Sequence, residues 1–277
     1  MLFSKMQACG NDFIVLDEEG IGEATGKALL AQRLCDRHYG IGGDGLLILR
    51  RNMADKIDME IYNADGSHAE ICGNGIRIAA KYAWDHGWVD VEKLYVECDG
   101  GLKIAERVME NGQTEMVCVD MGIPLLESQG GDGTKWPLES ACSRLPVKIV
   151  NGWKAFCVSM GNPHAVIILR QNDAWPTLAV GPMLEKAKEF PNGTNVEFVK
   201  VLDRSQISLR IWERGVGETL SCGSGACAAA AVCMQKGLTD DEITVTLLGG
   251  KLKVSRAPST GRFFLTGPAI TVFEGNV

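Results

Sequence analysis

Two cysteines stand in the same local pattern. Cys72 and Cys222 each come directly before a Gly-x-Gly turn, and each turn opens an apolar run, IRIAA after the first and ACAAAA after the second. The N-terminus of a helix presents unpaired backbone N–H groups and the positive end of the helix dipole, which lower the pKa of a nearby thiol and attract anions. Glycines let that backbone approach a ligand closely. The pattern therefore indicates acid–base thiols beside a site for a carboxylate.

These cysteines belong to an internal repeat. The segment IYNADGSHAEICGNG (61–75) aligns without gaps with IWERGVGETLSCGSG (211–225), at an offset of 222 − 72 = 150 residues. The segments CGNDFIVL (9–16) and MGNPHAVI (160–167) share Gly-Asn at an offset of 161 − 10 = 151 residues. Because chance similarity would not keep this spacing twice, we predict a duplicated half. Two such halves, facing each other across a cleft, would offer two like sites.

Two opposed thiols predict a particular chemistry. A carboxylate held between two helix ends would place the ligand's α-carbon between two sulfur atoms. Two thiolates at close range repel each other, so one thiolate and one thiol are expected at neutral pH. One cysteine would remove the α-proton and the other would deliver a proton from the opposite face, which inverts the stereocentre. Amides at the helix ends would stabilise the developing negative charge in a cleft without water.

Other interpretations of the cysteines are weaker. A Cys72–Cys222 disulfide would be an oxidised, inactive form. Cys222 and Cys227 give a C-x4-C spacing, but no C-x2-C pair accompanies it and the chain has only four histidines, so we expect no metal site. The other cysteines that we expect to pack as small core hydrophobes are Cys35, Cys98, Cys118, Cys142, Cys157, Cys227 and Cys233. The stretch GIGGDG (40–45) lacks the features of a phosphate loop and predicts a turn.

Hydrophobic periodicity predicts mostly strands with a minority of helices, which is typical of an α+β fold. Strands are expected at 114–120, 155–159, 164–169, 195–201, 206–212, 242–248 and 263–267. Helices are expected at 26–38, 74–86, 182–190, where Pro182 would open the helix, and 224–236. The Gly- and Pro-containing stretch 128–140 predicts a loop, and a domain boundary is expected near residue 120.

Composition narrows the class of partner. The 277 residues are 45% hydrophobic and 23% charged, which excludes a disordered chain and leaves room for two modest domains. A net charge of −7 argues against binding to nucleic acid or to an anionic membrane surface. The sequence has no apolar run of 18 residues and no signal-peptide pattern, so we expect a soluble cytoplasmic protein with reduced thiols and a small polar ligand.

The blocks FSKMQACGNDF, RHYGIGGDG, YNADGSHAEICGNGIR, SMGNPHAV, GTNVEF and ERGVGETLSCGSGACAAA resemble the diaminopimelate epimerase family over nearly the whole chain. The resemblance implies two pseudo-symmetric domains, 1–119 with 265–277 returning to it and 120–264, each a curved mixed sheet around a central helix, with the active site in the cleft between them. It also implies a homodimer that interconverts LL- and meso-2,6-diaminopimelate for lysine and peptidoglycan-precursor biosynthesis, without a cofactor such as pyridoxal phosphate.

The resemblance also implies roles for individual residues. Cys72 and Cys222 match the acid–base pair, and His164 and Glu213 match positions that tune the two thiols. The positions expected to bind substrate are Asn11, Asn63, Gly73, Asn74, Asn162, Asn195, Glu213, Arg214, Gly223 and Ser224. A substrate with two ammonium and two carboxylate groups needs amides, a guanidinium and a carboxylate, so these residue types fit. By residue type alone, Asn11 and Asn63 also fit turns, His164 a core histidine and Arg214 a solvated charge.

Two departures from the family pattern bear on specificity. Gln7, Ala8 and Cys9 stand where many relatives have His-Gly-Leu, and Gly45 stands where some relatives have a glutamine that reaches the substrate. Two alternatives therefore stay open: a racemase of the same fold for another amino acid, such as histidine or proline, and a thiol redox or metal-binding protein.

Overall fold

The computed structural model describes residues 1–22, 26–69, 72–110, 113–126, 134–135 and 147–277. Strands dominate and helices are few, which confirms the predicted α+β class. In chain order the elements are β1 (Leu2–Ala8), β2 (Asn11–Asp17), η1 (Glu18–Gly20), α1 (Lys27–Cys35), β3 (Gly45–Met53), β4 (Lys56–Asn63), β5 (His68–Ala69), α2 (Gly73–Asp85), β6 (Lys93–Glu97), β7 (Lys103–Glu110), β8 (Gln113–Gly122), β9 (Leu125–Leu126), β10 (Thr134–Lys135), β11 (Val147–Val150), β12 (Trp153–Ser159), β13 (Pro163–Leu169), α3 (Thr177–Glu185), β14 (Asn195–Asp203), β15 (Gln206–Glu213), β16 (Gly217–Thr219), α4 (Gly223–Gln235), β17 (Glu242–Leu247), β18 (Gly250–Arg256), β19 (Phe263–Gly267) and β20 (Ile270–Asn276).

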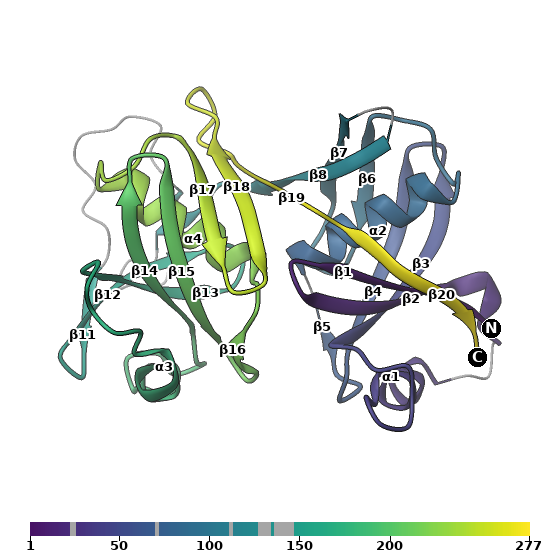
Figure 1. Ribbon diagram of the computed structural model, residues 1–277, viewed down its shortest axis with the longest axis horizontal. Helices are drawn as coiled ribbons and strands as arrows, with labels where there is room; N and C mark the ends of the chain where they lie inside the picture. Colours follow the sequence, from purple (N-terminus) through teal and green to yellow (C-terminus); the bar gives the residue numbers. More distant parts are fainter. Residues whose placement is uncertain (23–25, 70–71, 111–112, 127–133, 136–146) are drawn as a thin grey trace. The chain divides into compact units, whose positions relative to one another are not determined.

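The chain forms two compact units. Unit 1 consists of Met1–Val119 and Thr266–Val277, and unit 2 consists of Asp120–Leu265. The chain leaves unit 1 along β8 and returns to it along β19, and the last strand, β20, then pairs antiparallel with β1 (Figure 1). The two ends of the chain therefore lie in the same unit.

The strand pairing repeats between the two units. In unit 1, β2 and β3 are parallel with Phe13 opposite Gly45, and in unit 2, β13 and β14 are parallel with His164 opposite Asn195. The next hairpins, β4–β5 and β15–β16, pair Ile61 with Ala69 and Ile211 with Thr219, so both partners are offset by 211 − 61 = 150 residues. A parallel pair follows in each unit, β4–β6 and β15–β17. The predicted duplication is confirmed as a repeated topology.

Each unit encloses one central helix. Helix α4 packs against β12, β13, β14, β15, β17 and β18, and α2 packs against β1, β2, β3, β4, β6 and β7 (Figure 1). In α4, every residue from Gly225 to Met234 is buried. A helix buried on all sides has no polar face, and the alanines that dominate α4 keep it thin enough for the surrounding strands to pack closely. The positions of Cys72 and Cys222 follow from this arrangement, because each cysteine precedes a central helix.

Most predicted elements agree with the structure within two residues, but the two outer helices differ. Helix α1 ends at Cys35 instead of residue 38, because the carboxylate of Asp36 accepts the backbone N–H groups of His38 and Tyr39. The prediction of a helix at 182–190 was wrong. Helix α3 begins after Pro176 and contains Pro182, because it is placed by Leu184 and Val180, which pack against the core of unit 2. Of the predicted loop 128–140, only 134–135 lie among the described residues, and they form β10.

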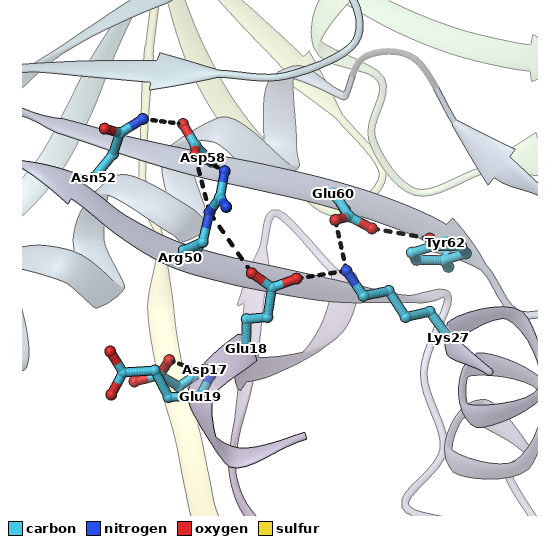
Figure 2. Close-up of polar contacts among 9 residues, drawn as sticks. All are labelled: Asp17, Glu18, Glu19, Lys27, Arg50, Asn52, Asp58, Glu60 and Tyr62. Carbon is cyan, nitrogen blue, oxygen red and sulfur yellow. Dashed lines mark hydrogen bonds and ion pairs between the residues drawn. The ribbon is translucent and has the colours of Figure 1, made fainter. Parts of the chain in front are cut away.

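Polar contacts hold α1 beside the sheet of unit 1. At the start of α1, Lys27 donates to Glu18 of η1 at 2.6 Å and to Glu60 of β4 at 2.7 Å. From β3, Arg50 pairs with Asp58, and its Nε lies 3.6 Å from Glu18 (Figure 2). These side chains are partly exposed, so each pair contributes at most about 1 kcal/mol and mainly fixes the position of α1.

The cysteines predicted to be core residues are largely buried. Cys35, Cys98, Cys157, Cys227 and Cys233 are buried, whereas Cys118 is only half-buried, because its side chain lies on the opposite face of β8 from the buried Val117 and Val119. Cys142 lies outside the described residues. No disulfide joins any two of the described cysteines. Among the described residues, no helix is both long and apolar enough to cross a membrane.

The repeat supplies a matched pair of substitutions at the two helix starts. A Cβ added at Gly225 would lie 2.8 Å from Oε1 of Glu197, whereas at Gly75 the nearest atoms would be 3.4 Å away. We expect Gly225→Ala to destabilise the protein by about 1–3 kcal/mol through overpacking. Gly75→Ala should change stability by no more than about 1 kcal/mol, since its contact is ordinary and alanine favours a helix. Urea unfolding measures both, and equal effects at the two sites would contradict the expectation.

Candidate functional site

In unit 1, Cys72 is the N-cap residue of α2. Its backbone is extended, with φ −144° and ψ 112°, and its Sγ accepts a hydrogen bond from the N–H of Gly75 at 3.4 Å. The thiol also lies 3.9 Å from Oδ1 of Asn11. The structure thus places this thiol at a helix N-terminus, as the sequence predicts, and brings it together with Asn11.

Two amides beside Cys72 are held by a buried arginine. Nδ2 of Asn74 donates to Oδ1 of Asn11 at 3.0 Å, and Arg77 donates to Oδ1 of Asn74 at 2.8 Å. Arg77 is 0% exposed and also donates to the carbonyl of Gly73 at 3.4 Å. The sequence analysis missed Arg77, although an arginine in the apolar run IRIAA was a visible signal.

Asn11 is fixed from its other side by an ionic cluster. Its Nδ2 donates to Asp44 at 2.8 Å, and Arg37 bridges Asp44 and Asp12 at 2.8 and 2.7 Å. Lys5 lies 2.5 Å from Asp12. Burial would raise the pKa of Asp12, but hydrogen bonds from Arg37 and Lys5 outweigh it and lower the pKa to about 2. Asn11 is therefore oriented by a cluster that the sequence analysis did not single out.

Asn63 and Gly45 lie together at one end of the β3–β4 pair. Asn63 is exposed and closes a turn, where its Nδ2 donates to Oγ of Ser67 at 2.9 Å. A Cβ at Gly45 would meet the carbonyl of Tyr62 at 2.7 Å, so a glutamine does not fit here without a shift of backbone. This close approach favours glycine at position 45.

In unit 2, Cys222 is the N-cap residue of α4. Its backbone is extended, with φ −132° and ψ 118°, and its Sγ lies 3.4 Å from Oγ of Ser224. Burial and then the nearby carboxylate of Glu213 raise the pKa of the Cys222 thiol well above its ordinary value. The expectation that the helix end lowers the pKa was wrong for this cysteine, because burial and a like charge outweigh the helix dipole.

Among the charged groups around Cys222, the carboxylate of Glu213 raises the pKa of the thiol most. Burial raises its pKa, while hydrogen bonds from Thr219, at 2.5 Å, and from Cys222 oppose the rise. Glu213 is therefore in contact with the thiol of Cys222.

His164 joins a buried chain of polar contacts. Its Nδ1 lies 2.6 Å from Oε1 of Glu197, and its Nε2 lies 2.9 Å from Oδ1 of Asn162. Nδ2 of Asn162 in turn donates to Oγ of Ser224 at 3.4 Å. The sequence analysis missed Glu197, and the signal for it was an acidic residue inside the otherwise apolar start of NVEFVKV.

Asn195 and Arg214 form a second contact pair in unit 2. Oδ1 of Asn195 accepts the backbone N–H of Arg214 at 2.9 Å, and Nδ2 of Asn195 donates to the carbonyl of Pro163 at 3.0 Å. The guanidinium of Arg214 is exposed and lines an open cavity of about 550 Å³ together with Lys186, Lys188 and Asn192. Asn195 thus holds the backbone from which a cationic side chain reaches this cavity.

Comparisons with known proteins agree on one family. A family profile described as Diaminopimelate epimerase matches residues 3–126 and 156–272. The diaminopimelate epimerase of Agathobacter rectalis is 40% identical over 287 residues, covering 100% of this chain and 99% of its own length. That of Moorella thermoacetica is 40% identical over 284 residues with coverage of 100% and 99%, and that of Methanococcus maripaludis is 39% identical over 282 residues with the same coverage.

Solved structures share the fold at low identity. A phenazine biosynthesis protein of the PhzF family from Bacillus anthracis superposes with a TM-score of 0.71 at 16% identity, covering 100% of this chain and 98% of that one. A probable proline racemase from Agrobacterium radiobacter gives a TM-score of 0.70 at 15% identity, with coverage of 100% and 92%. At this identity the likeness concerns the fold alone.

The ionic cluster beside Asn11 makes stability depend on pH. The folded pKa of Asp12, about 2, lies below its ordinary value of 3.8, so its contribution is full above pH 3.8 and is lost as pH falls through about 2. We expect Asp12→Asn to lower the unfolding free energy at pH 7 by about 2 kcal/mol, and the difference from the wild type to fall to about half near pH 3. Urea unfolding at both pH values checks this, and a gap that does not depend on pH would contradict it.

Proposed function

The chain belongs to the diaminopimelate epimerase family, and on that premise we propose that it interconverts LL- and meso-2,6-diaminopimelate. The observation that carries the proposal is that each unit presents a thiol, Cys72 or Cys222, as the N-cap of its enclosed helix. The reaction needs one acid and one base on opposite faces of a single carbon, so one thiol would come from each unit.

We assign different resting states to the two thiols. Burial and Glu213 raise the pKa of Cys222, so Cys222 rests as a thiol and is the proton donor. The base at rest is then Cys72, which removes the α-proton from the opposite face. The electron pair left by that proton is delocalised into the substrate carboxylate while Cys222 protonates the carbon. For the reverse reaction the two cysteines exchange roles. Both proton-transfer groups are side chains, so the scheme requires neither a cofactor nor a metal.

The carboxylate at the reacting end would bind backbone N–H groups at the helix N-termini. We assign this role to Gly73 and Asn74 of α2 and to Gly223 and Ser224 of α4, since these residues form the first turns. Such donors stabilise the charge that develops in the transition state, by about 3 kcal/mol each.

The remaining polar groups would bind the rest of the substrate. We assign the amides of Asn11, Asn63, Asn162 and Asn195 to its ammonium and carboxylate groups, and Arg214, with Glu213, to the far end. The exposed guanidinium of Arg214 beside an open cavity supports the assignment. His164 and Glu213 tune the thiols, which is consistent with their contacts with Asn162 and Cys222. The contacts assigned to the substrate would determine the KM for diaminopimelate, so a change in KM on substitution tests each assignment.

We further propose that the protein acts in the cytoplasm as a homodimer, in lysine and peptidoglycan-precursor biosynthesis. The strand β20 supports the dimer, because it carries the exposed apolar residues Ile270, Val272 and Phe273. An exposed apolar strand at the margin of a sheet is a surface on which a second copy can pair.

The two-thiol scheme predicts loss of activity at either cysteine. We expect Cys72→Ala and Cys222→Ala each to lower epimerisation by at least about 10³-fold in both directions, because each removes one of the two proton-transfer groups. The assay incubates stereopure diaminopimelate in deuterated water and follows inversion together with deuterium at the α-carbon. Cys233→Ala is the matched control, since Cys233 is buried in α4 among alanines and should tolerate the change.

Two results would contradict this proposal. Appreciable turnover in either cysteine variant would exclude the two-base scheme. Exchange by the wild type on proline or histidine, without exchange on diaminopimelate, would identify a racemase with another substrate.

The proposed dimer has its own test. Sedimentation equilibrium of the wild type is expected to give twice the mass of the 277-residue chain. Val272→Lys should shift the protein toward monomer, because it places a charge on the exposed strand, whereas Leu248→Lys, at an exposed residue of unit 2, should leave the dimer intact. A monomeric wild type would contradict the proposal.

A further inference from the structure

A carboxylate is buried beneath the N-terminus of α4. Glu197, on β14, is 0% exposed, and its Oε1 lies 2.6 Å from Nδ1 of His164, which is 1% exposed. Its Oε2 has no hydrogen-bond partner among the described residues. A Cβ at Gly225 would lie only 2.8 Å from Oε1, so the carboxylate is in direct contact with the first turn of the helix. Such burial is costly and calls for a compensating role.

Unit 1 shows that the fold itself does not require this carboxylate. The equivalent of Glu197 is Leu47, since Leu47 pairs with Ile61 as Glu197 pairs with Ile211. A Cβ at Gly75 would meet Leu47 at 3.4 Å, so leucine fills the same place below α2. The equivalent of His164 is Phe13, which stands opposite Gly45 as His164 stands opposite Asn195. Only unit 2 has an ionisable pair at this position.

The pair begins a continuous path to Cys222. Nε2 of His164 lies 2.9 Å from Oδ1 of Asn162, and this carbonyl oxygen can only accept, so Nε2 carries a proton. The amide is thereby oriented with Nδ2 toward Oγ of Ser224, at 3.4 Å. Because Oγ of Ser224 accepts from Asn162, its own proton is free to point at Sγ of Cys222, also at 3.4 Å.

The short contact between Glu197 and His164 holds one proton between the two groups. Written as imidazolium with carboxylate or as imidazole with carboxylic acid, the pair is neutral, and Nε2 stays protonated in both forms. The other ionisable groups that face the pair are Glu213 and Cys222. A neutral pair adds little net charge beside Cys222 while fixing the direction of the hydrogen bonds.

We propose that Glu197 is a positioning residue for the epimerase reaction: it fixes His164 and Asn162 so that the Ser224 hydroxyl donates to the thiolate of Cys222. The inference rests on the proposed function and adds to it a residue of unit 2 that contacts neither substrate nor the reacting atoms. Its effect is to stabilise the thiolate that forms each time Cys222 gives up its proton.

Two substitutions separate this role from simple packing. Glu197→Gln keeps a donor to Nδ1 of His164, and we expect kcat/KM to stay within about threefold of the wild type. Glu197→Leu copies unit 1 and frees the imidazole to change tautomer, and we expect kcat/KM to fall by about 10- to 100-fold, the loss of a hydrogen bond to a charged group. The fall in kcat/KM must be equal in both directions, because the ratio of the two kcat/KM values equals the equilibrium constant between the stereoisomers, which a substitution in the enzyme cannot change.

The pH profile provides the readout that packing alone would not change. The alkaline limb of kcat/KM reports the loss of the thiol proton, so Glu197→Leu should move this limb to higher pH, whereas Glu197→Gln should not. Phe198→Leu is the matched control, since Phe198 is a buried core residue on the same strand and should lower stability without moving the limb. A wild-type rate and profile in Glu197→Leu, or equal losses in both Glu197 variants, would overturn the proposal.

A spectroscopic measurement keeps the test independent of activity and of the folding of Glu197→Leu. The chain has four histidines, so labelling histidine with ¹⁵N gives few NMR signals. The signals that disappear in His164→Asn are those of His164. In the wild type we expect a protonated Nε2 and a hydrogen bond at Nδ1. An unprotonated Nε2, or an Nδ1 without a hydrogen bond, would overturn the proposal. An inactive wild type with the expected histidine signals would instead contradict the proposed function.

Discussion

The free N–H groups at the start of an enclosed helix constrain the rest of each unit. The first turn of an α-helix cannot satisfy its own amides, and burial removes water as the alternative partner. In both units the residue placed at this point is a cysteine, which is a weak acceptor and an ionisable group at once. The two turns differ in how much room they leave: at Gly225 the oxygen of Glu197 leaves no space for a Cβ, whereas at Gly75 a Cβ would be in ordinary contact with Leu47.

The polar groups around the N-cap cysteine differ between the two units. Around Cys72 the structure places the amides of Asn11 and Asn74 and the buried cation Arg77. Around Cys222 it places two carboxylates, Glu213 and Glu197, the second of which is joined to His164. A duplicated backbone therefore presents two thiols with different polar surroundings. For a reaction that starts from one thiol and one thiolate, such a difference decides where the proton rests before substrate arrives.

Part of this arrangement could be predicted from the sequence, and part could not. The repeat, the helix starts and the central strands could be predicted because their signals are local: a Gly-x-Gly turn after a cysteine, and β-branched runs of strand length. The roles of Glu197 and Asp44 could not, because each depends on a neighbour 33 positions away, His164 for Glu197 and Asn11 for Asp44. Helix α3 was misplaced for a related reason. Its position is set by the packing of Leu184 on the core, and that packing overrides the preference of Pro182 for a first turn.

The high pKa of Cys222 follows from the relative size of the competing effects. A helix dipole contributes about 0.3–2 kcal/mol to a charge at its N-terminus, whereas full burial of an ionisable group can shift its pKa by several units, each worth about 1.4 kcal/mol. Adding Glu213 increases the cost of a thiolate further. A thiol in this position needs directed donors if it is to release its proton at all, and Ser224 together with the N–H groups of the first turn of α4 are the donors within reach. The chain of hydrogen bonds that begins at Glu197 reaches Ser224, whose hydroxyl lies beside Sγ of Cys222. Unit 2 therefore contains both the groups that keep Cys222 protonated and the donor that stabilises its thiolate.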